Sequence, residues 1–220
     1  MYQLKNEDLS TFFGKIEIKP KQSLVITLDS KAGGGKTHSC YQFAQAFAES
    51  GYKPIIWSLE EHVESNLSRE KQQKYFDTNT QQIISIESEK TDLSGEDNYK
   101  RIIESIKYFD VILIDSLTKL IELNKQLKLD KDLRKAFDGK LFILILQRTA
   151  DGKMRGGSAT GFDGDIILKV DVDEGGDFKN NFIYNEKNRY NDFAPLSELK
   201  YSPFYQKLLQ KEPQEVYLNS

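Results

Sequence analysis

The chain has 220 residues, which is enough for one α/β domain with a substantial core. Its formal net charge is −3, so it has no overall basic field for nucleic acid, and any such contact requires a local basic patch. The single cysteine, Cys40, cannot form a disulfide within the chain, and no apolar run has the length of a membrane span. With the polar residues 1–11, these features predict a cytoplasmic protein that does not contact membranes.

Apolar runs in the first half of the chain alternate with helix-patterned segments. We expect a short edge strand over Gly14–Lys19, and buried strands over Leu24–Leu28, Pro54–Leu59 and Ile83–Ile86. A helix is predicted over Cys40–Ser50, because four apolar residues share one face at i, i+3, i+4 and i+7: Cys40, Phe43, Ala44 and Phe47. Gly51 is expected to end this helix, and Ser65–Thr80 is polar with only a weak pattern.

The second half continues the alternation. Helices are predicted over Asn98–Lys107 and over Leu117–Phe137, the latter with a break near Leu127–Asp130. Apolar strands are predicted over Asp110–Asp115 and Leu141–Leu146. Strands that are apolar throughout and alternate with helices indicate an α/β fold, with a mostly parallel sheet and helices on both faces.

The pattern changes after residue 164. Two strands, Asp165–Val172 and Asn181–Asn185, flank a turn and predict an antiparallel hairpin at the sheet edge. We therefore expect a core over residues 23–198, an N-terminal segment over 1–22, and a tail over 199–220 that packs on the core or on a neighbour.

A glycine-rich loop, Ser30–Thr37, lies between the first buried strand and the Cys40 helix. Strand, glycine-rich loop, Lys-Thr and helix are the layout of a phosphate-binding P-loop, although Ser30 stands where the first glycine is usual. Lys36 is predicted to reach the β- and γ-phosphates of ATP, and the Thr37 hydroxyl to hold Mg²⁺. The predicted ATP-binding residues are Ser30, Lys31, Ala32, Gly33, Gly34, Gly35, Lys36, Thr37 and His38.

Three polar residues stand at the ends of apolar strands and are candidates for catalysis. Asp115 is predicted to be a Walker B carboxylate that binds Mg²⁺; the alternative is a cap for the next helix. Glu60 is a candidate to polarise the attacking water, but Glu61 is equally suited by spacing, and a solvated acidic turn is also open. Gln147 is a candidate γ-phosphate sensor, because an amide both donates and accepts.

Two basic segments are candidates for partner contacts. One segment is the loop after Gln147, which is rich in small residues and contains Arg148, Lys153 and Arg155. It suits nucleotide-dependent binding of a polyanion; the alternative is an ordinary solvated loop. Lys187 and Arg189 alternate after the last hairpin strand and are candidate cations for the γ-phosphate of an adjacent subunit. A simple surface pair is the alternative.

The order of these motifs resembles the ATPase core of RecA-fold proteins over roughly residues 22–192. Ser58-Leu59-Glu60 is similar to the DnaB-type helicases. Asp151-Gly152-Lys153-Met154-Arg155-Gly156 and Lys187-Asn188-Arg189 are similar to the RadA-type recombination proteins. The first DNA loop of the family is short or missing here, and there is no zinc-ribbon cysteine cluster and no N-terminal helicase domain. The size resembles the small phage or mobile-element versions.

The resemblance implies a RecA-like P-loop NTPase that hydrolyses ATP with Mg²⁺ at subunit interfaces of a ring or filament, coupled to single-stranded DNA in recombination, repair or replication. It implies Glu60 as catalytic base, Gln147 as sensor, Lys187 and Arg189 as trans-acting cations, and 148–161 as the DNA-facing loop. The main alternative is a ParA/MinD-like partition ATPase. In that case Lys31 acts across a dimer, although Glu60-Glu61 and the residues after Asp115 depart from that pattern.

Overall fold

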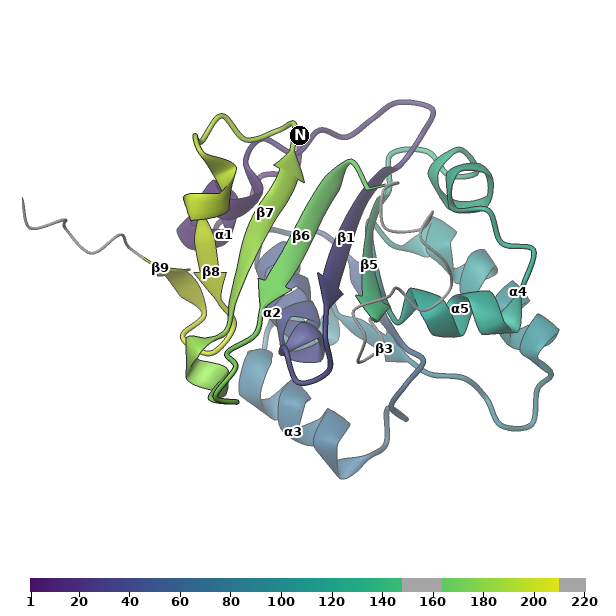
Figure 1. Ribbon diagram of the computed structural model, residues 1–220. Coiled ribbons are helices and arrows are strands. Elements are labelled where there is room, and N and C mark those ends of the chain that lie inside the picture. The colour runs from purple at the N-terminus through teal and green to yellow at the C-terminus, as the bar shows by residue number, and fades with distance from the viewer. Residues whose placement is uncertain (148–163, 210–220) are drawn as a thin grey trace, which may run out of the picture.

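A single sheet of nine strands runs through the residues that the computed structural model describes, 1–147 and 164–209 (Figure 1). The strand order is β3-β2-β4-β5-β1-β6-β7-β8-β9, and the first six of these are parallel. The parallel strands are β1 (Leu24–Ser30), β2 (Pro54–Ser58), β3 (Ser85–Glu87), β4 (Val111–Asp115), β5 (Leu141–Gln147) and β6 (Ile166–Asp171). The antiparallel strands are β7 (Phe182–Asn188), β8 (Lys200–Ser202) and β9 (Lys207–Leu209).

Helices cover both faces of the parallel part of the sheet. On one face, α2 (Lys36–Glu49) packs on β1, β2 and β4, and alternate strand residues such as Ile26, Ile56 and Leu113 join its core. On the other face, α4 (Gly95–Ser105) and α5 (Leu117–Leu123) pack on Val25, Ile112 and Phe142. Because successive strand residues enter different cores, strands buried on both faces read as continuous apolar runs.

The remaining helices of the described residues are short. They are α1 (Glu7–Phe13), α3 (Asn66–Tyr75), and helical turns at Thr80–Gln82, Ile106–Tyr108, Leu129–Arg134 and Phe178–Asn180. A last turn spans Leu196–Glu198. The break between α5 and Leu129–Arg134 confirms the interruption predicted near Leu127. Gly51, with a φ of 89°, follows the end of α2 as predicted. Over the described residues, no helix combines the length and apolarity needed to span a membrane.

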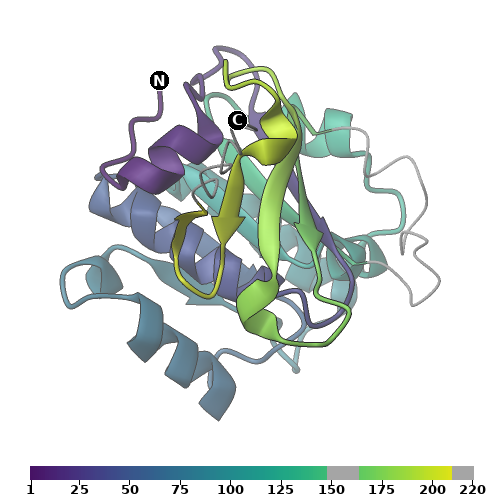
Figure 2. The same cartoon turned by 60° about the vertical axis from the view of Figure 1, so that its left-hand side comes forward.

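The edge strand predicted over Gly14–Lys19 was wrong. The segment has no strand; the ordered element before it is α1, which Asn6 caps through its side chain. Phe12 and Phe13 are fully buried, and Figure 2 shows α1 beside β8. Gly14 has a φ of 73°, and a Cβ there would lie 2.2 Å from the Tyr190 carbonyl oxygen, so only glycine allows this exit from α1.

The antiparallel hairpin is confirmed, but it does not form the sheet edge. β7 pairs with β6 on one side and with β8 on the other, and β9 lies at the edge. Residues 200–209 of the predicted tail therefore belong to the sheet. Tyr201 is buried in the α2 core and donates a hydrogen bond of 2.9 Å to Gln42. The tail contains few β-favouring residues, and charged residues interrupt them. Its sequence pattern therefore does not predict these two three-residue strands.

Candidate nucleotide-binding site

The loop between β1 and α2 has the backbone geometry of an anion site. β1 ends at Ser30, and α2 begins at Lys36 after Gly35, whose φ of 86° is left-handed. Gly35 has no side chain that could cap the helix, so N–H groups of the first turn of α2 remain available to an anion. A Cβ on Gly35 would also lie 2.3 Å from the ring of Phe178. Both constraints explain why glycine stands at this position.

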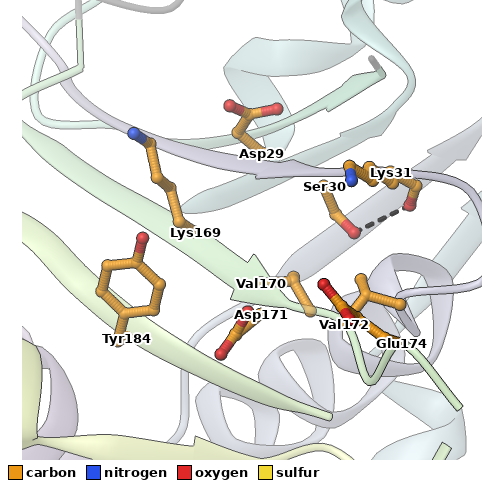
Figure 3. A pocket seen from close by; sticks show the side chains of 9 residues that line it. All are labelled: Asp29, Ser30, Lys31, Lys169, Val170, Asp171, Val172, Glu174 and Tyr184. Carbon is orange, nitrogen blue, oxygen red and sulfur yellow. Dashed lines mark hydrogen bonds between the residues drawn. The ribbon is translucent and has the colours of Figure 1, made fainter. Parts of the chain in front are cut away.

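Ser30 occupies the position of the usual first glycine, and the loop accommodates it through Gly34. The Ser30 hydroxyl donates a hydrogen bond of 2.8 Å to the Lys31 carbonyl oxygen (Figure 3). A Cβ on Gly34 would lie only 2.0 Å from that hydroxyl oxygen. The serine therefore fits because its neighbour across the turn has no side chain.

The predicted metal ligands lie together. Thr37 donates a hydrogen bond of 2.7 Å from its hydroxyl to a carboxylate oxygen of Asp115, which ends β4. Burial raises the pKa of Asp115 to about 6, and the Thr37 hydrogen bond opposes this rise. Mg²⁺ in nucleotide sites is held by one or two protein oxygens plus phosphates and waters, and this hydroxyl and carboxylate are such a donor set. Asp115 precedes α5, but its side chain is directed to the P-loop.

Lys36 is buried in the same pocket. Its ammonium group donates hydrogen bonds to the carbonyl oxygens of Ser30, at 3.1 Å, and Lys31, at 2.9 Å. Burial lowers the pKa of Lys36, while the negative charges of Asp115 and Glu60 raise it. The lysine thus spans the mouth of the loop, which is where phosphates of a nucleotide would bind.

The two adjacent glutamates have different surroundings. Glu60 is exposed and accepts a hydrogen bond of 2.5 Å from the Gln147 side-chain amide, so the predicted base and the predicted sensor are in contact. Glu61 accepts hydrogen bonds from the Ser65 hydroxyl, at 2.7 Å, and from Lys71, with which it forms an ion pair. Burial raises the pKa of Glu61, but these two partners hold it below its usual range. Glu60 is therefore the residue of the pair that lines the pocket.

The pocket contains two residues that sequence reasoning missed. Its lining consists of Ala32, Gly33, Gly34, Gly35, Lys36, Thr37, His38, Glu60, Lys71, Asp115, Gln147 and Phe178. Lys71 comes from α3, within the segment that had only a weak pattern, and Phe178 comes from the β6–β7 connection. His38 contacts both of these segments: its Nδ1 lies 2.8 Å from the hydroxyl of Tyr75 in α3, and its ring lies 5.5 Å from that of Phe178. No local signal marks either residue, because long-range packing brings them to the loop.

Lys31 lines a second pocket, beside the P-loop (Figure 3). This pocket is bordered by the end of β1 and by β6 and β7, through Asp29, Ser30, Lys31, Lys169, Val170, Asp171, Val172, Glu174 and Tyr184. Lys31 is exposed and does not belong to the lining of the Lys36 pocket. Ser30 and Lys31 nevertheless contribute the carbonyl oxygens that hold Lys36.

Lys187 lies level with the middle of β1, and Arg189 follows it toward the end of the sheet opposite the P-loop. Lys187 is in register with Ile167 of β6, and Ile167 with Thr27 of β1, three residues before the P-loop begins. Because β7 is antiparallel to β1, the chain moves away from the P-loop as it continues to Arg189. The Lys187 ammonium donates a hydrogen bond of 2.8 Å to the Gly164 carbonyl oxygen. Asn188, between the two cations in sequence, is buried. Its side-chain amide donates a hydrogen bond of 2.9 Å to the carbonyl oxygen of Phe13 in α1.

The predicted DNA-contact residues Arg148, Lys153 and Arg155 lie outside the described residues. The acid that follows this loop, Asp165, is described. It accepts hydrogen bonds from the Lys19 ammonium, at 2.7 Å, and from the Val25 backbone N–H, at 3.0 Å. This carboxylate therefore ties the start of β6 to β1 and to the N-terminal segment.

Comparisons with known proteins identify the architecture. No family model matches the sequence, and no curated protein matches it. Among the solved structures that are similar, two have a TM-score of 0.62 each. The flagellar accessory protein FlaH from Methanocaldococcus jannaschii is 16% identical, with coverage of 91% of this chain and 92% of that one. The KaiC-like protein PH0186 from Pyrococcus horikoshii OT3 is 17% identical, with coverage of 94% and 96%. The chain therefore has the RecA-like P-loop fold that the motif order predicted.

Proposed function

We propose that this protein is a Mg²⁺-dependent ATPase of the RecA-like class, which acts on single-stranded DNA in recombination, repair or replication. The observation that carries the ATPase proposal is the contact of Thr37 with Asp115 at 2.7 Å, next to Lys36 in a glycine-rich loop. A hydroxyl and a carboxylate hold Mg²⁺ while a lysine and backbone N–H groups hold the phosphates. FlaH and the KaiC-like protein share the fold, which is consistent with this assignment.

The positions of Glu60 and Gln147 support hydrolysis of the bound nucleotide. Glu60 lines the pocket with an exposed carboxylate, which suits a group that orients and polarises the attacking water. Mg²⁺, when bound, would neutralise charge on the transferring phosphoryl group. Gln147 would exchange its hydrogen bond with Glu60 for one with a γ-phosphate oxygen, and so distinguish ATP from ADP.

Lys187 and Arg189 are proposed to serve the active site of a neighbouring subunit. The strand register directs them away from the P-loop of their own subunit, which supports action in trans rather than in cis. Such a cation stabilises the charge of the phosphoryl-transfer transition state. A ring or filament of copies would place this end of one subunit against the nucleotide of the next.

The DNA part of the proposal rests on the loop after Gln147. Arg148, Lys153 and Arg155 are concentrated there, although the chain as a whole is acidic. The experiment that tests the function is the ATPase rate of the purified protein with and without single-stranded DNA, alongside Lys36→Ala. We expect Mg²⁺-dependent hydrolysis that DNA accelerates and that Lys36→Ala abolishes. Hydrolysis by Lys36→Ala at the wild-type rate would refute the ATPase site, and absence of any DNA effect would favour the partition-type alternative.

A further inference from the structure

Lys71 is positioned in the nucleotide pocket although it lies far from the P-loop in sequence. Its side chain is only 15% exposed, and it lines the same pocket as Lys36 and Asp115. Its partner in this structure is Glu61, whose other oxygen accepts the Ser65 hydroxyl at 2.7 Å. Glu61 is thus satisfied by a hydroxyl even without Lys71, so the lysine can leave it at a limited cost.

Contacts between α3 and α2 determine where Lys71 lies. Ser68, Lys71 and Tyr75 are spaced at i, i+3 and i+7, so they share one face of α3. The two outer members bind α2: the Ser68 hydroxyl is 3.1 Å from the Tyr41 hydroxyl, and the Tyr75 hydroxyl is 2.8 Å from Nδ1 of His38. Lys71, between them, therefore faces the first turn of α2, which follows the P-loop directly.

The charges of the side chains that line the pocket indicate a role for Lys71 in binding an anion. Among the described residues that line it, the lysines are Lys36 and Lys71, and the carboxylates are Glu60 and Asp115. Without Lys71, the lining side chains would carry one positive and two negative charges, so Lys36 and the proposed Mg²⁺ would have to balance the charge of the phosphates.

We propose that Lys71 is a second phosphate-binding lysine, which leaves Glu61 and contacts the phosphates of the nucleotide bound in its own subunit. This inference rests on the proposed ATP site. The flexible stem and compact charge of lysine suit such a change of partner. Glu61 is then the partner of Lys71 in the nucleotide-free protein, and Glu60 remains the residue that faces the water.

The test is calorimetric titration of Mg²⁺ with ATPγS, and separately with ADP, into four variants and Lys36→Ala. Lys71→Gln keeps a side chain that can hydrogen-bond Glu61 but removes the charge, and Lys71→Arg keeps the charge. Glu61→Gln weakens the ion pair and frees Lys71. Lys74→Gln is the matched control, because it removes an exposed charge from the same helix. Thermal denaturation of each variant reports whether it is folded.

We expect Lys71→Gln to weaken ATPγS binding by about tenfold or more, as for loss of a hydrogen bond between charged groups. Lys71→Arg should retain most of the affinity, Lys74→Gln should bind like wild type, and Glu61→Gln should bind as well as or better than wild type. A larger loss for ATPγS than for ADP would place the contact on the γ-phosphate.

Two results would overturn the inference. Equal weakening of binding in Glu61→Gln and Lys71→Gln, with equal loss of thermal stability, would make the ion pair purely structural. Wild-type affinity in Lys71→Gln, with binding lost in Lys36→Ala, would remove Lys71 from the site and leave the ATPase proposal intact. If Lys36→Ala also binds like wild type, the proposed function itself fails.

Discussion

The side-chain amide of Gln147 donates a hydrogen bond of 2.5 Å to the carboxylate of Glu60. Gln147 is the last residue of β5 and Glu60 follows β2, and β4 lies between these two strands in the sheet. Their contact joins the residue that precedes the basic loop to the residue that faces the nucleotide pocket. In the proposed mechanism, movement of the Gln147 amide toward a phosphate would weaken this hydrogen bond, which would link phosphate sensing to the carboxylate of Glu60.

Glu60→Gln should retain nucleotide binding and lose turnover by about 10²–10⁴-fold, the usual contribution of a general base. The substitution keeps size and hydrogen bonding but removes the basic carboxylate. Glu61→Gln should have a much smaller effect on turnover, because Glu61 is engaged by Lys71 and Ser65. Steady-state ATPase assays with a parallel binding measurement check both. Normal turnover in Glu60→Gln together with loss in Glu61→Gln would exchange the two roles.

Replacement of Arg148, Lys153 and Arg155 by alanine should weaken binding to single-stranded DNA in the presence of ATP. Wild-type affinity should fall with salt by a slope of roughly 0.7 per neutralised phosphate, and the triple variant should show a shallower slope. Fluorescence anisotropy over a salt series measures this. The control is a triple alanine variant of three exposed lysines elsewhere, Lys90, Lys100 and Lys107. Equal affinities for both triple variants and wild type would contradict the DNA-binding loop.

Mixtures of Arg189→Ala and Lys36→Ala should recover ATPase activity that neither variant has alone. Some interfaces would then combine an intact P-loop from one subunit with an intact Arg189 from the next. Such a cation raises the rate of hydrolysis by about 10³–10⁵-fold. The assay is a titration of one variant into the other under conditions that allow subunit exchange. Lys36→Ala mixed with Glu60→Gln is the matched control, because both residues line the pocket of one subunit and no interface regains both. No recovery in confirmed mixed oligomers would place the cations in cis or outside the site.

Asp165→Asn should destabilise the protein at neutral pH by on the order of 2 kcal/mol, because a largely buried carboxylate loses its ion pair with Lys19. Burial raises the pKa of Asp165, but hydrogen bonds from Lys19 and from the Val25 N–H outweigh this and hold it below its usual range. Because the pKa of Asp165 is lower in the folded than in the unfolded protein, its ionised form stabilises the fold at any pH above the pKa of the unfolded state. This contribution to the free energy of unfolding is lost as the pH falls through the pKa of the folded state.

Urea denaturation of wild type and Asp165→Asn between pH 7 and pH 3 tests this. The two unfolding free energies should converge as the pH falls, because wild type loses what the variant already lacks. Asp171→Asn, an exposed site on the same strand, is the control and should behave like wild type. A constant difference between wild type and Asp165→Asn across the pH range would show that the carboxylate charge is not involved.

The sequence by itself determined the parallel sheet, the P-loop and the acid that faces it. Strands buried on both faces must be apolar throughout, so β1, β4 and β5 were recognisable without any partner. Lys36 and Thr37 follow β1 through the P-loop and Asp115 ends β4, and the carboxyl ends of parallel strands lie at one edge of a sheet. Their proximity was therefore a consequence of topology alone.

Only the tertiary structure decided which glutamate faces the pocket and which residues complete it. Glu60 and Glu61 are adjacent and chemically equivalent in the sequence. They differ in the structure because Lys71 of α3 forms an ion pair with Glu61. Helix α3 is mostly polar, so its place on α2 depends on contacts such as Tyr75 with His38 rather than on an apolar stripe. For the same reason α1 and β8 were not foreseen: short elements are stabilised by long-range packing, here around Phe12, Phe13 and Tyr201, and local sequence patterns do not encode that packing.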